Sequence, residues 1–383
     1  MTMILITGGL GFLGRNLSVH LAERKDCVVR IFDQDNSMQE LQAWVLEADI
    51  IFHLAGVNRP KDPKEFETGN THLTEDICGF IKQSGRSPKI VFSSSIQAQM
   101  DNPYGTSKAQ AEVALRALAA ETSARVRIYR LKNLFGKWCR PNYNSVTATL
   151  CHNIAHDLPI SISDPANSVQ LSYVDDVIAA FLTEIESEHE EIEAGADIPA
   201  YRIQLGDLAG RIQTYHDMSA TLTLPDFADW FNRALYATYL SYVPPETLQH
   251  NLDIKSDARG SLAEFIKQKH FGQIFVSRTK PGITRGNHYH HTKTEKFFVV
   301  EGDGLIRMRA IEGGSVKEYT VTGSAYQVID IPPGFTHSIT NVGLGEMVTL
   351  FWSSEMFDPN RPDTYFLPVD IETSSKSSLL ENA

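Results

Sequence analysis

Cysteine is scarce in this sequence, and the few cysteines stand far apart. Four occur in 383 residues, none in a Cys-x-x-Cys spacing, at positions Cys27, Cys78, Cys139 and Cys151. Zinc ribbons and the disulfide frameworks of small secreted proteins need closely spaced or numerous cysteines, so the sequence excludes both classes. Isolated thiols are typical of a reducing compartment, and we therefore expect a cytoplasmic protein.

Long apolar runs and an excess of basic charge are also missing. No apolar stretch approaches the roughly 20 residues of a membrane span, and the opening MTMILITGG lacks the regions of a signal peptide. With 35 basic and 47 acidic residues, the formal net charge is −12, which disfavours binding to nucleic acid or to an anionic membrane. We therefore expect neither partner, and an anionic ligand must find its positive charge locally.

The pattern of apolar residues changes along the chain. In the first third, apolar runs such as Met3–Thr7 and Ile50–Leu54 alternate with helical stretches, which predicts a parallel, doubly wound sheet. After about Asn251 many short strands are separated by Gly, Pro and Asn, which predicts an all-β barrel. The expected organisation is an α/β Rossmann-type domain over residues 1–247, a barrel over 248–371 and a disordered tail over 372–383.

The first predicted strand runs directly into a glycine-rich stretch, TGGLGFLG. Glycines here allow a tight turn and close approach of the backbone to a pyrophosphate, which the next helix binds at its N-terminus. Asp33 ends the second strand, where a carboxylate typically hydrogen-bonds the adenosine ribose and favours NADH; otherwise it belongs to a surface turn. The coenzyme-binding residues expected from this pattern are Gly8, Gly11, Phe12, Leu13, Gly14 and Asp33.

A tyrosine and a lysine four residues apart, Tyr104 and Lys108, share one face of a predicted helix. A nearby ammonium stabilises a phenolate, so the pair suits proton transfer to a carbonyl oxygen during hydride transfer. A serine run ends the preceding strand, and we expect Ser95, in preference to Ser94, to hydrogen-bond the reacting oxygen. The predicted catalytic residues are therefore Ser95, Tyr104 and Lys108, of which Tyr104 and Lys108 also contact the coenzyme.

Six ordered motifs over residues 1–245 resemble the extended short-chain dehydrogenase/reductases. They are TGGLGFLG, His53-Leu54-Ala55-Gly56, SSS, YGTSK, Asn133-Leu134-Phe135-Gly136 and Tyr173-Val174-Asp175-Asp176. The resemblance implies a nucleotide-sugar substrate, whose diphosphate Asn133 would contact. It also implies coenzyme-site roles for Leu54, Ala55, Gly56 and Asn70, the last holding the active-site helix. Local positive charge would come from Arg130, Lys132 and Lys137.

One reaction within that group is disfavoured by the sequence. The related 4,6-dehydratases carry an Asp-Glu pair just after the serine run, whereas this chain has Ile96 and Gln97 there. Neither side chain can act as an acid or a base. Reduction or 4-epimerisation is therefore favoured over dehydration.

The predicted barrel carries four potential metal ligands. His288 and His290 alternate on one strand and so face the same way, Glu295 follows after a turn, and His337 lies in the downstream string PPGFTHSITN. Three imidazoles and one carboxylate with an open position suit Zn²⁺, Fe²⁺, Mn²⁺ or Ni²⁺. The spacing resembles both cupin motifs, and we expect a divalent metal, Zn²⁺ before the others, at these four residues.

Two further strings in the barrel, DARGSLAEF and RGNHY, resemble the cupin-type sugar-nucleotide 3,5-epimerases. In those enzymes the histidine matching His288 removes a proton beside a 4-keto group. A ligated imidazole nitrogen has no free lone pair. If His288 binds a metal, the base must therefore be another residue, and the candidates are His291, Lys296 and Tyr365.

The domain order and the strings NLFGKWCRPNYNSV, GVNRP, KPGIT and EMFDPN resemble one group over residues 1–368. This group is the bifunctional UDP-sugar epimerase/reductases of capsular and O-antigen polysaccharide synthesis. The resemblance implies that the cupin epimerises C3 of a UDP-2-acetamido-2,6-dideoxy-4-hexulose. The other domain would reduce C4 with NADPH to UDP-2-acetamido-2,6-dideoxy-L-talose, on the route to UDP-N-acetyl-L-fucosamine. The resemblance thus implies NADPH, whereas Asp33 favours NADH, and both coenzymes stay open.

Two other interpretations stay open. One is a single-function UDP-sugar 4-epimerase with a structural or regulatory cupin, which would recycle bound NAD. The other is a non-enzymatic sugar-nucleotide sensor or assembly protein. We also expect a homodimer, because the edge strands of a barrel form a ready interface.

Overall fold

The computed structural model describes residues 1–370 apart from 61 and 63, and it divides into two compact units. The first contains Met1–His216 and Trp230–Pro245, and the second contains Asp217–Asp229 and the chain from Glu246. The tail expected at 372–383 lies outside the described residues. Within the described part, no helix is both long and apolar enough to cross a bilayer.

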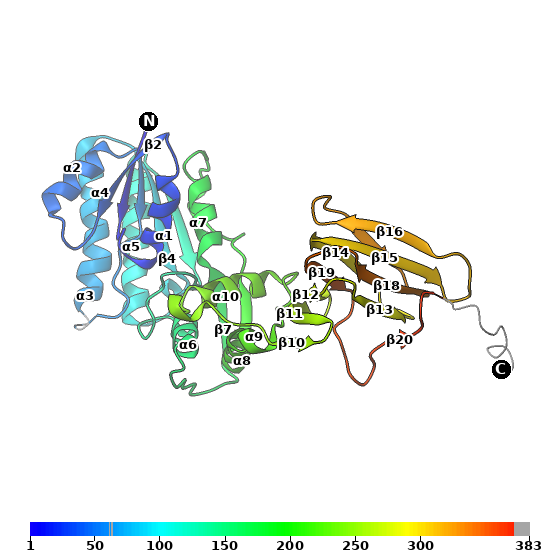
Figure 1. Cartoon of the computed structure of the whole chain (residues 1–383). Coiled ribbons are helices and arrows are strands. Elements are labelled where there is room, and N and C mark those ends of the chain that lie inside the picture. The colour runs from blue at the N-terminus through cyan, green and yellow to red at the C-terminus, as the bar shows by residue number, and fades with distance from the viewer. Residues whose placement is uncertain (61, 63, 371–383) are drawn as a thin grey trace. The chain divides into compact units, whose positions relative to one another are not determined.

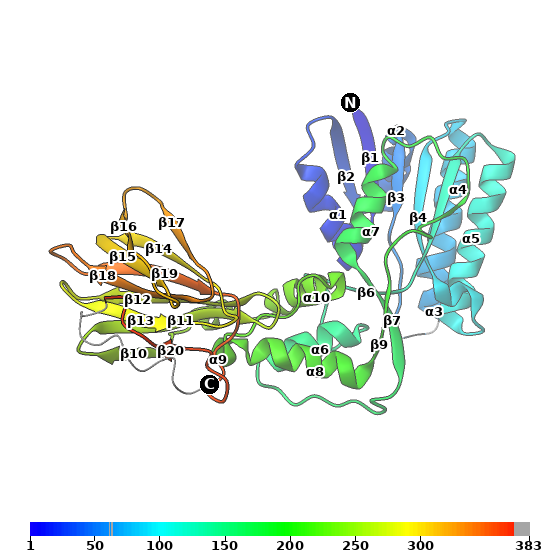
Figure 2. The ribbon, with the colours of Figure 1, turned by 90° about the vertical axis from the view of Figure 1, so that its right-hand side faces the viewer.

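Six parallel strands form the main sheet of the first unit, in the order β2-β1-β3-β4-β5-β8 (Figures 1 and 2). The strands are β1 Thr2–Thr7, β2 Cys27–Phe32, β3 Ile50–His53, β4 Lys89–Ser95, β5 Arg125–Leu131 and β8 Glu193–Ala194. Helices connect most of them, as the alternation of apolar runs and helical stretches predicted. The expected doubly wound α/β sheet is confirmed.

Helices cover both faces of this sheet. They are α1 Phe12–Ala22, α2 Met38–Glu47, α4 Leu73–Ser84, α5 Pro103–Glu121 and α7 Val174–Thr183. Leu5 of β1 belongs to one buried cluster with side chains of α2, α4 and α5. Its neighbours Ile4 and Ile6 belong to another cluster with α1 and α7. Because successive side chains of a strand point to opposite faces, an apolar run such as β1 is buried on both.

A smaller layer completes the first unit. It contains a short sheet, β6-β7-β9, and three helices. These elements are β6 Asn133–Phe135, β7 Ser168–Tyr173, β9 Tyr201–Gln204, α6 Val146–Ala155, α8 Leu205–His216 and α10 Trp230–Leu240. Between β3 and α4 the chain forms the short helix α3 Lys64–Phe66 and then a π-helix over Glu67–His72.

The second unit is built from two antiparallel sheets, in the orders β10-β11-β12-β19-β14-β17 and β16-β15-β18-β13-β20. The strands are β10 Ile254–Asp257, β11 Gly260–Gln268, β12 Gly272–Thr279, β13 Thr284–Tyr289, β14 Glu295–Glu301, β15 Asp303–Ala310, β16 Lys317–Thr322, β17 Val328–Ile331, β18 Phe335–Asn341, β19 Met347–Ser353 and β20 Tyr365–Phe366. Phe297 and Phe351 from one sheet pack with Ile306 and Ile339 from the other. The all-β fold expected here is confirmed.

Residues 217–229 leave the first unit before its last helix begins. They include the short helix α9, Met218–Thr221. The backbone N–H of Leu224 donates to the carbonyl of Lys267 on β11, and the N–H of Lys267 donates to Leu222, both at 2.8 Å. These backbone bonds attach the segment to the second unit, so the chain enters that unit ahead of residue 247.

Candidate active site and metal centre

The glycine-rich turn between β1 and α1 is tightly packed. Gly8 has a φ of +70°, and a Cβ there would lie 2.6 Å from the Cα of Ala55. A Cβ on Gly14 would lie 2.2 Å from the carbonyl oxygen of Gly8. Only glycine fits at either position. Gly11 precedes α1 without a side-chain cap, which leaves the first N–H groups of that helix able to bind an anion.

Asp33 braces this turn from the end of β2. Its carboxylate accepts hydrogen bonds from the backbone N–H of Leu10, at 2.8 Å, and of Gln34, at 2.9 Å. The side chain is half-buried. It therefore has a structural role in shaping the glycine turn, in addition to the ribose contact expected from its position.

Leu54, Ala55 and Gly56 follow β3 beside the same turn. The N–H of Leu54 donates to the carbonyl of Thr7 at 3.1 Å. A Cβ on Gly56 would lie 3.0 Å from Asn70 Oδ1 and from Lys108 Nζ. The loop that was expected to contact the coenzyme thus lies directly against Lys108, the lysine predicted to be catalytic.

Asn70 joins that loop to the active-site helix α5. It is buried in the π-helix, where its Oδ1 accepts from the N–H of Val57 at 2.7 Å. Its Nδ2 donates to the carbonyl of Val57 and to Ser107 Oγ, both at 2.9 Å. These three hydrogen bonds hold the loop and the helix together.

Helix α5 begins at a well-formed cap. Asn102 accepts a hydrogen bond from the N–H of Gly105 at 2.8 Å, and Pro103 occupies the first turn. Tyr104 therefore lies in the first turn and Lys108 one turn later. Lys108 Nζ donates to the carbonyl of Ser93 at 3.0 Å and lies 4.8 Å from the Phe92 ring centre.

The structure brings Ser95, Tyr104 and Lys108 into one site at the end of β4. Ser95 lies near enough to Tyr104 for its hydroxyl to favour the phenolate and so lower the pKa of Tyr104. Burial nevertheless raises the pKa of Tyr104 above its ordinary value, because it outweighs the effect of Ser95. Burial also lowers the pKa of Lys108 to about 8, which the charge of Glu112 partly offsets. At neutral pH the phenol of Tyr104 is therefore protonated, as a proton donor requires.

Ser94 is engaged elsewhere. Its hydroxyl donates to Glu112 Oε1 at 2.6 Å, and the guanidinium Nε of Arg130 donates to the same oxygen at 2.9 Å. Ser95 is thus the serine that reaches Tyr104, which was the preferred of the two candidates. Glu112 was not anticipated, although its position four residues after Lys108 on the same helix face is a readable signal.

The expected local positive charge is largely paired within the protein. Arg130 forms an ion pair with Glu112, and Lys137 forms one with Asp175. Asn133, by contrast, begins β6 with an exposed side chain. A pocket of about 460 Å³ includes the loop after β6, the start of α6 and Arg59, and the polar residues lining it include Arg59, Asn142, Tyr143, Asn144, Ser145 and Ser161.

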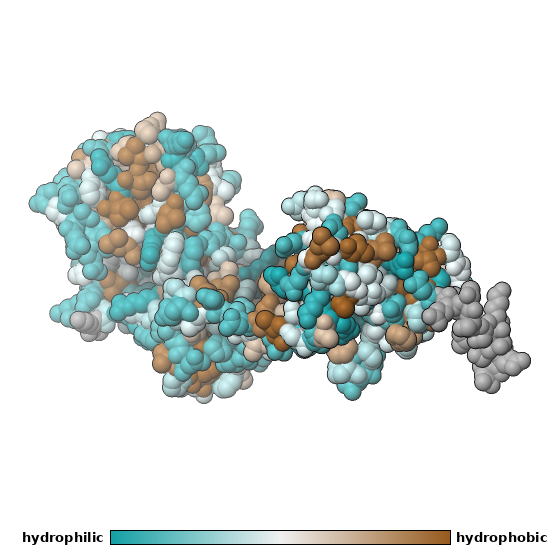
Figure 3. All heavy atoms as spheres, viewed as in Figure 1, coloured by the Kyte–Doolittle hydropathy of each residue, from teal (hydrophilic) through white to brown (hydrophobic). Residues whose placement is uncertain are grey.

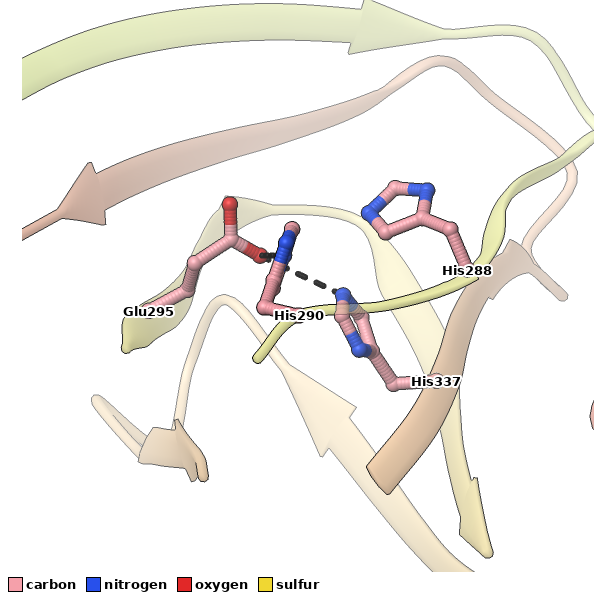
Figure 4. A group of neighbouring side chains, drawn as sticks. All are labelled: His288, His290, Glu295 and His337. Carbon is pink, nitrogen blue, oxygen red and sulfur yellow. Dashed lines mark ion pairs between the residues drawn. The ribbon is translucent and has the colours of Figure 1, made fainter. Parts of the chain in front are cut away.

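The four expected metal ligands come together in the second unit (Figure 4). His288 on β13 lies opposite His337 on β18, and Glu295 opens β14. Glu295 Oε2 is 3.3 Å from His290 Nε2 and 3.2 Å from His337 Nε2. One potential ligand atom from each residue lies within 4.8 Å of the others.

The chemistry of this cluster fits a divalent metal. The Nε2 atoms of His290 and His337 are buried without a hydrogen-bond partner. Burial lowers the pKa of His288 to about 4, so its ring is neutral near pH 7. Burial favours the protonated form of Glu295, but the nearby imidazoles of His290 and His337 outweigh this and hold the pKa of Glu295 at about 2. Three imidazoles and one ionised carboxylate form a donor set that suits Zn²⁺.

The three candidate bases lie outside this cluster's donor set. Lys296 follows Glu295 and so faces the other side of β14, where it pairs with Asp330. His291 is exposed, and its ring lies 4.7 Å from the ring of Tyr365 and 5.3 Å from that of Tyr289. His291 and Tyr365 therefore share an aromatic group, whereas Lys296 stands apart from it.

Comparison with known proteins gives consistent relatives over nearly the whole chain. Residues 4–195 match the NAD dependent epimerase/dehydratase family, and residues 255–365 match the polysaccharide biosynthesis C-terminal domain. The chain is 41% identical to the UDP-2-acetamido-2,6-beta-L-arabino-hexul-4-ose reductase of Pseudomonas aeruginosa, over 96% of this chain and 98% of the relative.

Solved structures agree. The crystal structure of the capsular polysaccharide assembling protein CapF from Staphylococcus aureus superposes with a TM-score of 0.87 and 44% identity, over 96% of this chain and 100% of that one. The UDP-glucuronic acid 4-epimerase of Bacillus cereus shares only the fold, at 18% identity and a TM-score of 0.51, over 56% of this chain and 83% of that one.

Proposed function

Because the chain belongs to the NAD dependent epimerase/dehydratase family, we propose that its first unit reduces the C4 ketone of a UDP-linked 2-acetamido-2,6-dideoxy-4-hexulose with NADPH or NADH. The observation that carries this proposal is the 41% identity, over 96% of the chain, to a relative named as a reductase of such a sugar. The grouping of Ser95, Tyr104 and Lys108 supports it, because these are the groups that a ketone reduction uses.

In the proposed reaction a bound nicotinamide coenzyme supplies the hydride to C4. Tyr104 gives its phenolic proton to the developing alkoxide, and the Ser95 hydroxyl hydrogen-bonds the same oxygen. The ammonium of Lys108, which the Ser93 carbonyl holds at 3.0 Å, stabilises the phenolate that remains. Glycines 8, 11 and 14 admit the pyrophosphate, and the polar pocket at the loop after β6 and the start of α6 takes the nucleotide of the substrate.

We further propose that the second unit epimerises C3 of the same ketone before reduction. Its residues His288, His290, Glu295 and His337 would hold a divalent ion, for which we propose Zn²⁺, whose Lewis acidity suits acidification of a C–H beside a carbonyl. His291 and Tyr365 are the remaining candidates for the base. Reduction removes the ketone and so prevents further epimerisation. The product would be UDP-2-acetamido-2,6-dideoxy-L-talose, on the route to UDP-N-acetyl-L-fucosamine.

The test is coenzyme oxidation with the UDP-linked 4-keto-6-deoxy-N-acetylhexosamine in deuterium oxide, followed by NMR of the product. Oxidation together with deuterium at C3 is the expected result, and the faster coenzyme identifies the preference. Interconversion of UDP-sugars at C4 without net oxidation would replace this proposal by a single-function 4-epimerase with a structural or regulatory second unit.

A further inference from the structure

One imidazole of the metal cluster has its two nitrogens in different environments. Nδ1 of His290 lies 2.5 Å from the backbone carbonyl oxygen of Asp363. A carbonyl can only accept a hydrogen bond, so Nδ1 carries the proton. The neutral ring then keeps its lone pair on Nε2, which lies 3.3 Å from Glu295 Oε2. A metal ligand in a protein typically has its second nitrogen held in this way.

The side chain of Asp363 holds that carbonyl in place. Its carboxylate accepts three successive backbone N–H groups of the turn between β13 and β14: His291 at 2.9 Å, Thr292 at 3.0 Å and Lys293 at 2.9 Å. The Thr292 hydroxyl donates to the same carboxylate at 3.1 Å. Asp363 is thus hydrogen-bonded both to the turn that follows His290 and to the His290 ring itself.

The backbone around Asp363 is adapted to this double contact. Asp363 has a φ of +40°, a left-handed conformation that aspartate tolerates better than most residues. The buried Lys293 donates from Nζ to the carbonyl of Pro362 at 2.7 Å. Two residues later β20 pairs with β13, placing Phe366 beside His288. The C-terminal segment is therefore attached along the strand that carries His288 and leads into His290.

We propose that Asp363 is a positioning residue for the metal centre: its carboxylate fixes the 291–293 turn and so keeps its own carbonyl on Nδ1 of His290, with Nε2 facing the metal position. The inference rests on the proposed metal site, because it concerns how tightly and in which geometry an ion is held. A merely structural clamp would alter the stability of the second unit without changing either property.

The experiment compares the full-length wild type with Asp363→Ala and Asp363→Asn. Asp358→Asn is the matched control, because its exposed carboxylate, in the same segment, accepts from the N–H of Asn360 at 2.9 Å and is remote in sequence from the ligands. Zn²⁺ affinity is measured by competition with a chromogenic chelator. The visible spectrum of the Co²⁺-loaded protein reports the ligand geometry, and circular dichroism reports folding.

We expect Asp363→Ala to weaken Zn²⁺ binding about 10- to 100-fold, the usual effect of losing a partner of a ligating histidine, and to alter the Co²⁺ spectrum. The Zn²⁺ affinity of Asp363→Asn should fall between those of the wild type and Asp363→Ala. One amide oxygen remains to accept hydrogen bonds, but the NH₂ group faces the N–H groups of the turn and cannot accept from them. Asp358→Asn should match the wild type.

Equal Zn²⁺ affinity and an unchanged Co²⁺ spectrum in both Asp363 variants would overturn the role of Asp363 alone. Loss of the folded second unit in both variants would overturn it too, because the clamp would then be a general stability element. A wild-type chain that binds neither ion would instead overturn the metal site on which the inference rests.

Discussion

At the scale of single residues, the proposed role of Tyr104 as the proton donor can be tested directly. Replacement by phenylalanine removes the proton donor and leaves the ring in place. We expect Tyr104→Phe to lower the rate of NAD(P)H oxidation by about 10²- to 10⁴-fold, the range for loss of a general acid. A stopped-flow or steady-state assay with the UDP-linked ketone measures this. Tyr319→Phe, an exposed tyrosine of the second unit, is the control, and equal rates in all three proteins would reject Tyr104 as the acid.

The lowered pKa of Lys108 predicts how the free energy of unfolding changes with pH. Its pKa is about 8 in the folded protein and 10.5 in its ordinary state. Between these values the unfolded chain binds a proton that the folded chain does not, so stability rises with pH in that window. Relative to Lys108→Met, the free energy of unfolding of the apoprotein should increase by about 2 kcal/mol from pH 7.5 to 9.5.

Urea unfolding at the two pH values measures this increase. Lys25→Met is the control, because that side chain is exposed in the folded protein and in water when unfolded, so its difference from the wild type should stay flat. A constant difference between wild type and Lys108→Met across the range would show that the folded protein does not depress this pKa.

At the scale of elements, helix α5 and the π-helix position the site together. The wider π turn carries Asn70 inward, where it bonds the loop after β3 and Ser107 of α5. Glu112, one turn beyond Lys108, bonds Ser94 of β4 and Arg130 of β5. These bonds attach α5 to two strands and a loop. Tyr104 and Lys108 both lie on α5, so their positions are fixed by the same bonds.

Glu112→Gln tests this attachment. Arg130 would lose its charged partner, so we expect a loss of about 1–3 kcal/mol in the free energy of unfolding. The ammonium of Lys108 would lose a stabilising charge, so its pKa should fall further. The alkaline limb of the pH–rate profile for reduction should then move to lower pH.

The control is Glu121→Gln, because the Glu121 carboxylate pairs with Lys82 at the exposed end of the same helix. This substitution should change neither the free energy of unfolding nor the pH–rate profile appreciably. An unshifted profile in Glu112→Gln would remove this residue from the electrostatics of the site.

At the scale of the whole molecule, the proposed function assigns reduction to the first unit and epimerisation to the second. We expect His337→Ala to abolish deuterium incorporation at C3 while NAD(P)H oxidation continues with the supplied ketone. Tyr104→Phe should show the converse pattern. NMR of the sugar and coenzyme absorbance, measured on the same samples, separate the two activities. Loss of both activities in both variants, with folding intact, would show that the units do not act independently.

Oligomeric state belongs to the same scale. Apolar residues gather on the visible face of the second unit over strands β14 to β16 (Figure 3). Among the exposed apolar side chains of this unit are Val300 on β14, at 47%, and Val328 on the edge strand β17, at 52%. An apolar surface beside an unpaired strand edge favours association. We predict a homodimer at micromolar concentration by sedimentation equilibrium, which Val328→Asp should dissociate. A monomeric wild type would reject the dimer, and dissociation by Val113→Asp instead would place the interface on the first unit.

Much of the candidate site could be predicted because its chemistry is local in sequence. The glycine turn, the Tyr104–Lys108 spacing and the alternation of His288 with His290 each lie within a few residues, where period and spacing decide direction. Glu112 and Asp363 were missed for the opposite reason. Glu112 forms its hydrogen bonds with strands 18 residues away on either side in the sequence, and Asp363 accepts hydrogen bonds from a turn about 70 residues earlier.

The sequence by itself determined the fold class of both units and the identity of the groups brought into the two sites. Apolar periodicity and glycine spacing act over short stretches, so they can be interpreted without the tertiary fold. Only the tertiary structure decided which serine reaches Tyr104, that Arg130 and Lys137 are already paired, and that residues 217–229 join the second unit. These outcomes depend on which distant segments meet, because hydrogen bonds and ion pairs act only over a few ångströms.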